Sequence, residues 1–138
     1  MDILKVEKTK ILQDGRPVRL KGVNLGGWLM PEGYIMHAPN RAHRFFKTDF
    51  VKTLGPQAYA ELERAFRGNF IVEADIARMT AFGFNCLRVP FHYGLVETKP
   101  FVYSRDGVGY LDRVIGWARK HAVLIILDMH AAPGAQNG

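Results

Sequence analysis

An uninterrupted apolar run, Val123-Leu124-Ile125-Ile126-Leu127, decides the fold class of this chain. Continuous apolar runs are typical of strands that are buried on both faces, as in parallel sheets covered by helices. An amphipathic helix is predicted directly before it, from about Gly109 to Lys120, because apolar residues recur there at helical spacing. The sequence therefore predicts a helix that leads into a buried parallel strand.

The same order of helix and strand is predicted upstream. One helix begins at about Pro56, a favoured first-turn residue, and ends at Gly68-Asn69. A second helix runs from about Val72 to Gly83 and leads into a strand over 85–89, which Pro90 is expected to limit. Strands that alternate with helices predict an α/β fold with a parallel sheet.

The first fifty residues have a different pattern. Strand-like alternation fills the first twenty residues, and Asp14-Gly15 is typical of a tight hairpin turn. A short strand is expected over 20–25. Residues 28–50 then predict a long loop with a short helix, because prolines and glycines interrupt any regular pattern.

Composition excludes several classes of protein. The chain has 138 residues, 48% of them hydrophobic, which excludes general disorder, and no apolar run approaches the roughly 18 residues of a spanning helix. The single cysteine, Cys86, excludes an internal disulfide and any Cys-x-x-Cys metal site. The five histidines do not have the His-Glu-x-x-His spacing of a zinc site. The net charge of +6 is scattered, so nucleic acid is not an expected partner.

Polar and aromatic residues follow each predicted parallel strand, at the sheet edge where α/β folds bind ligands. Flat aromatic rings match the C–H faces of a sugar, whereas Asn, Glu and His supply directed hydrogen bonds to hydroxyls. An arginine in such a pocket can hold a carboxylate ionised. The candidates are Asn24, Trp28 and Glu32; Arg88, His92 and Tyr93; and Asp128, His130, Gln136 and Asn137.

Three motifs resemble glycoside hydrolase family 5, and within it the exo-β-1,3-glucanase group. The segment KGVNLGGW at 21–28, with Glu32 four residues on, is similar to the motif of the first strand. GFNCLRVP at 83–90 resembles the second-strand motif, and DMHAAPGAQNG at 128–138 resembles the third. The motifs occur in family order and cover the chain nearly end to end.

The resemblance implies an eight-stranded (β/α) TIM barrel, of which residues 1–138 would be the amino-terminal part of a single catalytic domain. It also implies retaining hydrolysis of β-glucosidic bonds by two glutamates, without metal or organic cofactor. In the family the acid/base lies in an Asn-Glu motif after strand four and the nucleophile ends strand seven. The chain contains no Asn-Glu dipeptide, so both catalytic glutamates are expected in the carboxyl-terminal part of the barrel. We therefore expect this chain alone to be inactive.

By the same resemblance, Arg88 matches the arginine that hydrogen-bonds the nucleophile, His130 matches an active-site histidine, and Glu32 matches a glutamate that binds the terminal sugar. For several candidates the residues alone leave two interpretations open. Glu32 is a sugar ligand or a solvated loop carboxylate, and Asn24 is a site residue or a cap of the strand end. Trp28, His92 and Tyr93 are site residues or packing residues. Asn137 is a candidate substrate-binding residue, and Asp128 is expected to bond backbone behind His130.

The functional prediction is a glycosidase whose substrate is a β-glucan, an oligosaccharide or a β-glucoside. Two alternatives stay open: a non-catalytic carbohydrate-binding or assembly module, and another TIM-barrel enzyme that shares the Arg88 and His130 pair. The charged first residues leave no room for a signal peptide. The location in the cell therefore stays open. We expect either a cytoplasmic protein or a protein whose signal segment is not part of this sequence.

Overall fold

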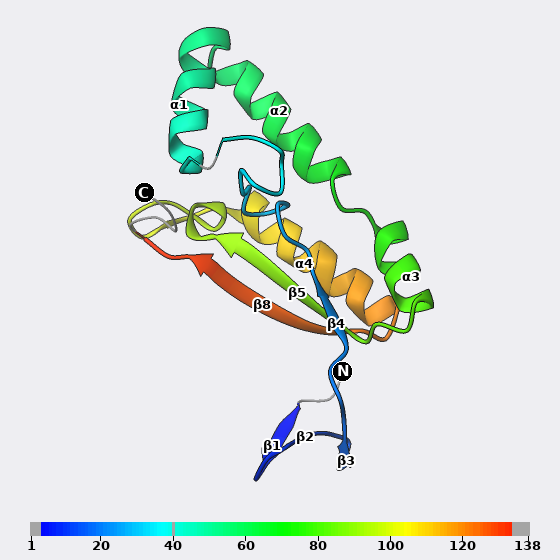
Figure 1. Ribbon diagram of the computed structural model, residues 1–138. Coiled ribbons are helices and arrows are strands. Elements are labelled where there is room, and N and C mark those ends of the chain that lie inside the picture. Colours follow the sequence, from blue (N-terminus) through cyan, green and yellow to red (C-terminus); the bar gives the residue numbers. More distant parts are fainter. Residues whose placement is uncertain (1–3, 40, 134–138) are drawn as a thin grey trace.

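The computed structural model describes residues 4–39 and 41–133 and centres on a sheet of three parallel strands (Figure 1). The strands lie in the order β4-β5-β8, and both neighbouring pairs run parallel. Helices separate them along the chain, so all three strands point toward the same end of the sheet. The predicted α/β class with a parallel sheet is confirmed. The strands are β4 (Gly22–Asn24), β5 (Cys86–His92) and β8 (Leu124–Ala131).

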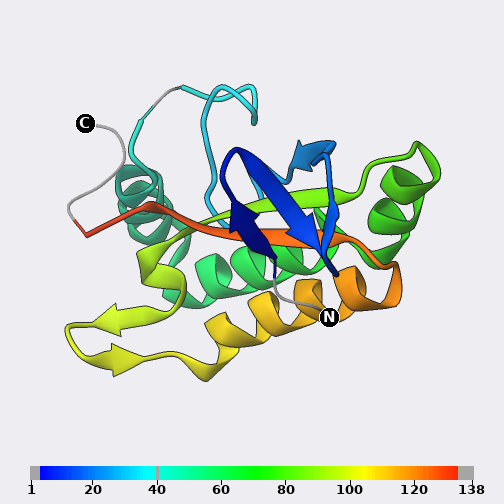
Figure 2. The ribbon, with the colours of Figure 1, turned by 90° about the horizontal axis from the view of Figure 1, so that it is seen from below.

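Helices supply the apolar layer against which the sheet packs. Figure 2, which views the molecule from below, shows α4 running along the sheet. The core joins residues of the sheet to Ile76 of α3 and to Leu111 and Val114 of α4. No helix of the described ranges is long and apolar enough to cross a membrane. The helices are α1 (His43–Leu54), α2 (Pro56–Asn69), α3 (Glu73–Ala81), α4 (Arg105–Lys120) and a short 3₁₀ turn, η1 (Tyr93–Leu95).

The amino-terminal residues form a separate antiparallel sheet at the end of the parallel strands where β4 begins (Figure 1). Its turn between β2 and β3 is the predicted Asp14-Gly15, and both residues have positive φ, 53° and 74°. Glycine accepts that conformation without steric cost, and aspartate tolerates it. The predicted hairpin is thus confirmed. The strands are β1 (Lys5–Glu7), β2 (Lys10–Gln13) and β3 (Arg16–Pro17).

Pro90 does not limit β5, which continues to His92. Arg88 and His92 direct backbone groups toward the β4 side, where Arg88 accepts from the N–H of Leu25 and His92 donates to the carbonyl of Leu29. Pro90 lies between them and faces the same side. Because β4 ends at Asn24, no strand there needs the missing N–H.

Two segments between the strands differ from prediction. Residues 43–54 form a full helix, α1, which starts within the predicted loop of residues 28–50 and continues past its end. The loop after β5 holds an unpredicted hairpin of β6 (Glu97–Lys99) and β7 (Val102–Tyr103). α1 has no fully buried residue, so its sequence lacks the clear apolar stripe that predicts helices.

The prediction that the apolar run of β8 is buried on both faces is wrong for this chain. Ile126 and Leu127 are 46% and 43% exposed. β8 is an edge strand, and no described strand pairs with its far side. Its apolar side chains are therefore only half covered.

A small ionic cluster ties the first residue of α3 to the last turn of α4. Glu73 Oε1 accepts from Lys120 Nζ at 2.6 Å and lies 3.1 Å from His121 Nε2. The hydrogen bond from Lys120, and then that from His121, lower the pKa of the Glu73 carboxyl. The carboxylate is therefore favoured in the folded chain.

We expect Glu73→Gln to lower the urea midpoint of unfolding near pH 7. Because the folded pKa of Glu73 is lowered, its stabilisation is present above the ordinary carboxyl pKa and is lost as the pH falls through the folded pKa. The two midpoints should therefore converge near pH 2. Glu61→Gln is the matched control, because Glu61 lies on exposed helix surface and accepts from the amide of Gln57 rather than from a charged group. A midpoint difference that persists at low pH would contradict this origin.

Candidate functional site

Arg88 of β5 lies at the centre of a polar cluster built from all three parallel strands. Its Nη1 donates to Asn24 Oδ1 of β4 at 2.8 Å. Its Nη2 donates to Asp128 Oδ2 and lies 2.9 Å from His130 Nδ1, both of β8. His130 Nδ1 is in turn 3.0 Å from Asp128 Oδ2. The guanidinium of Arg88 thus connects Asn24 and His130, and all three are residues that the sequence predicted for the site.

The strand register explains why these side chains meet. Asn24 is paired with Arg88, and Arg88 is paired with Ile126 of β8. Successive side chains of a strand alternate between faces, so Asp128 shares the face of Ile126 and follows it toward the carboxyl end. His130 lies at a register shift between Met129 and Ala131, and its Nδ1 approaches Asp128 Oδ2. Arg88 is long enough to reach forward to both.

Glu32, in the loop after β4, lies beside this cluster and is not solvated. It is only 8% exposed, and Tyr34 Oη donates to its Oε1 at 3.4 Å. An added Cβ on Gly26 would lie 3.0 Å from Asn24 Nδ2 and 3.7 Å from Glu32 Oε2, so the two side chains flank that glycine. The interpretation of Glu32 as a solvated loop carboxylate is therefore wrong.

Tyr34 is a site neighbour that the sequence analysis missed. The charge of Glu32 raises the pKa of the Tyr34 phenol, and the charge of Arg88 acts in the opposite direction. Tyr34 is 68% exposed. Only its position two residues after Glu32 could have indicated it.

Trp28 does not contribute a sugar-facing ring, so its place among the substrate-binding residues is corrected. The side chain is fully buried, stacks on Trp117 of α4 with ring centroids 6.2 Å apart, and donates from Nε1 to the Arg67 carbonyl at 2.9 Å. A ring enclosed on both sides has no face left for a substrate. Of its two interpretations, the core role is the one observed.

His92 and Tyr93 stack on each other, with ring centroids 4.6 Å apart. His92 Nδ1 accepts from the N–H of Gly94 at 2.9 Å. Burial, followed by the charge of Arg67, lowers the pKa of His92. The charge that acts on the pair is thus on α2, outside the Arg88 cluster, and their role as substrate ligands stays a prediction. Asn137 and Gln136 lie outside the described residues.

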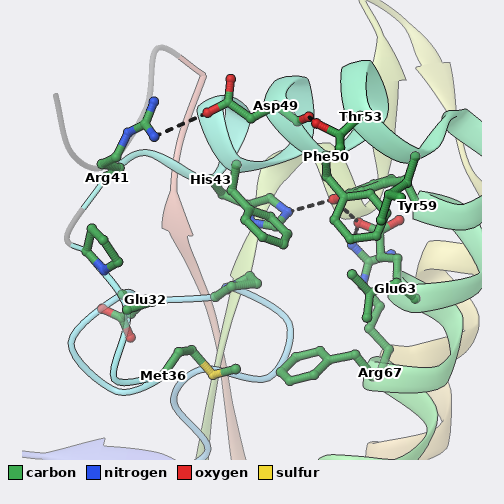
Figure 3. Close-up of a pocket in the computed structure, with 18 residues that line it drawn as sticks. Glu32, Met36, Arg41, His43, Asp49, Phe50, Thr53, Tyr59, Glu63 and Arg67 are labelled. Carbon is green, nitrogen blue, oxygen red and sulfur yellow. Dashed lines mark hydrogen bonds and ion pairs between the residues drawn. The ribbon is translucent and has the colours of Figure 1, made fainter.

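A cavity of about 590 Å³ opens next to Glu32, between the loop after β4 and the facing sides of α1 and α2 (Figure 3). A hydrogen-bonded chain crosses its wall. His43 Nε2 lies 2.9 Å from Tyr59 Oη, Tyr59 donates to Glu63 Oε1 at 3.1 Å, and Arg67 donates to the same oxygen at 2.7 Å. Most other lining groups are apolar: Pro31, Met36, Ala38, Pro39, Phe46, Phe50, Leu54, Leu62 and Phe66.

Two ionisable side chains of this cavity have pKa values shifted mainly by burial, and four others form ion pairs. Burial raises the pKa of Tyr59, with Glu63 acting in the same direction, and burial lowers the pKa of His43. Glu63 pairs with Arg67, and Arg41 at the rim pairs with Asp49 at 3.2 Å. The cavity therefore offers apolar contacts beside Glu32 rather than a site for an ion. His43 takes part in the hydrogen-bonded chain through Tyr59.

Asp128 has a different role from the one expected. Its carboxylate bonds the side chains of Arg88 and His130, not backbone behind His130. No group of three or more His, Cys, Asp or Glu within 4–39 and 41–133 is arranged to hold a metal ion.

Comparison with known proteins finds that the chain is similar to part of several glycosidases. It is 36% identical to a beta-xylosidase of Phanerodontia chrysosporium over 99% of this chain and 29% of the relative. It is 32% identical to a glucan 1,3-beta-glucosidase of Blumeria graminis over 96% of this chain and 33% of the relative. The chain thus spans about a third of the length of these relatives. No family model matches it.

The fold agrees with solved glycosidase structures. Rutinosidase from Aspergillus niger superposes with a TM-score of 0.64 at 25% identity, over 82% of this chain and 33% of that one. The three parallel strands described above are therefore part of a TIM-barrel sheet. By sequence the chain is a homologue of glucan 1,3-beta-glucosidases and a beta-xylosidase, and by fold it is similar to a rutinosidase of glycoside hydrolase family 5.

Proposed function

We propose that a protein carrying this chain at the length of its relatives hydrolyses β-glucosidic bonds in glucans or β-glucosides with retention of anomeric configuration. The observation that carries the proposal is the convergence of Asn24, Arg88 and His130 from three adjacent parallel strands. They meet at the carboxyl ends of the strands, where TIM-barrel enzymes place their chemistry. The curated relatives, named as glucan 1,3-beta-glucosidases and a beta-xylosidase, support the same class of reaction.

In this proposal the chain supplies the sugar-binding wall and the arginine, and the rest of the barrel supplies both catalytic glutamates. Retention needs two carboxyl groups about 5–5.5 Å apart, one a nucleophile and the other an acid/base. Arg88 donates to the nucleophile and keeps it ionised, because a paired cation lowers a carboxyl pKa. Glu32, Asn24 and His130 bond the sugar hydroxyls. The chain alone binds but does not hydrolyse.

The test is to follow hydrolysis of a β-glucoside and a β-1,3-linked glucose oligosaccharide by ¹H NMR with the protein at the length of its relatives. The β-anomer of glucose should form first and then mutarotate. Initial formation of the α-anomer would contradict retention. Hydrolysis of a β-xyloside with neither glucose substrate cleaved would overturn the glucoside assignment.

A further inference from the structure

We propose that Asp128 is a positioning residue that sets the tautomer of His130, so that the neutral imidazole carries its proton on Nδ1 and keeps Nε2 as an acceptor for a ligand. The role assigned to Nε2 rests on the proposed function, whereas the tautomer itself does not. The inference starts from three polar atoms that lie within hydrogen-bonding distance of one another: Arg88 Nη2, Asp128 Oδ2 and His130 Nδ1.

Two arrangements of hydrogens satisfy these contacts, and they differ only at the histidine. A guanidinium can only donate and an ionised carboxylate can only accept. His130 Nδ1 therefore either accepts from Arg88 at 2.9 Å or donates to Asp128 at 3.0 Å. It cannot do both, because in a neutral ring this nitrogen carries either a proton or a lone pair.

The carboxylate decides between the two arrangements. Its charge is shared by two oxygens, whereas the guanidinium charge is spread over three nitrogens, so Oδ2 carries the larger charge near Nδ1. An unprotonated Nδ1 would also set its lone pair against that oxygen. With the proton on Nδ1, Arg88 and His130 both donate to Asp128, and each bond is charge-assisted.

The arrangement has a consequence for substrate recognition. The Nδ1–H is held by a carboxylate on the same strand, as in many functional histidines whose second nitrogen is kept for a ligand. The His130 side chain is 36% exposed, so a ligand can reach it. Neutral His130 thus accepts a hydrogen bond from a sugar hydroxyl through Nε2 instead of donating one.

The contrast that tests this is Asp128→Ala. With the carboxylate gone, Arg88 becomes the charged neighbour of Nδ1, and that nitrogen then has to accept. The proton moves to Nε2, so a single substitution reverses the tautomer. A side chain that only packed against His130 would not produce this reversal.

The experiment is a long-range ¹H–¹⁵N correlation spectrum of the whole chain, labelled with ¹⁵N-histidine and recorded near pH 8, where an unperturbed imidazole is neutral. His130→Gln assigns the His130 signals by their loss. His92 is an internal reference for the opposite tautomer, because its Nδ1 accepts from Gly94. Asp112→Ala is the control variant, since this exposed residue of α4 lies outside the cluster.

The expected result is the Nδ1–H pattern for His130 in the unaltered chain and in Asp112→Ala, and the Nε2–H pattern in Asp128→Ala, with His92 unchanged. An Nε2–H pattern in the unaltered chain, the mixed pattern of a free imidazole, or no change on Asp128→Ala would each overturn the proposal. The readout needs no substrate. A protein that fails to hydrolyse β-glucosides therefore refutes the proposed function without deciding the tautomer.

Discussion

Replacing Arg88 with alanine is expected to lower kcat by roughly 100- to 1000-fold in the protein at the length of its relatives, the usual cost of removing a donor aimed at developing charge. Arg88 is bonded to Asn24, Asp128 and His130 at once, so its loss releases a side chain on each neighbouring strand. In the proposed function the same guanidinium also keeps the nucleophile ionised. The measurement is kcat and KM on a β-glucoside, together with a thermal unfolding midpoint.

Two further variants make the Arg88 experiment decisive. Arg88→Lys keeps the charge but has a single ammonium, which cannot bridge Asn24 and Asp128 as the two guanidinium nitrogens do, so we expect it to be almost as inactive. Arg119→Ala removes an equal charge from the exposed side of α4 and should leave kcat unchanged. Near-normal turnover in folded Arg88→Ala would remove Arg88 from the reaction.

How much of the fold is predictable from the sequence depends on which residues are buried. The helix containing Leu111 was predicted because burial of one face imposes a helical period, and the strand after Val123 was predicted from its apolar run. α1 was not predicted at its full length, since none of its residues is fully buried and its aromatic and basic residues fit several structures. The start of α4 was placed four residues late. Ser104 accepts from the N–H of Gly107 and caps the helix ahead of its apolar stripe.

The candidate site was predictable where it follows from strand alternation and less so where it depends on a loop. Arg88 and Asn24 come together because the register of the parallel strands pairs them, and Asp128 follows Ile126, the partner of Arg88 on β8, by two residues. Glu32 and Tyr34 reach the cluster through the loop after β4, whose path no periodicity encodes. Trp28 was ambiguous for another reason: the same ring serves as a sugar platform or as core, and only the position of Trp117 decides.

The second large effect concerns Gly107, in the first turn of α4. It is buried against η1, and an added Cβ would lie 2.6 Å from the Leu95 carbonyl carbon and closer still to its oxygen. Neither group can move freely, because Leu95 belongs to the core and Ser104 fixes the helix start. We therefore expect Gly107→Ala to destabilise the chain by about 1–3 kcal/mol or more, as overpacking does, although alanine is the better helix former.

The same helix provides the control for that expectation. Gly109 and Gly116 also lie in α4, and an added Cβ on either would meet no atom within 4 Å. Gly116→Ala should therefore stabilise the chain by about 0.5–1 kcal/mol through helix propensity alone. Opposite signs for Gly107 and Gly116 in urea unfolding would separate close packing from propensity on one element. If both substitutions stabilise the chain, α4 does not pack on the Leu95 carbonyl, and the junction between β5 and α4 is built differently.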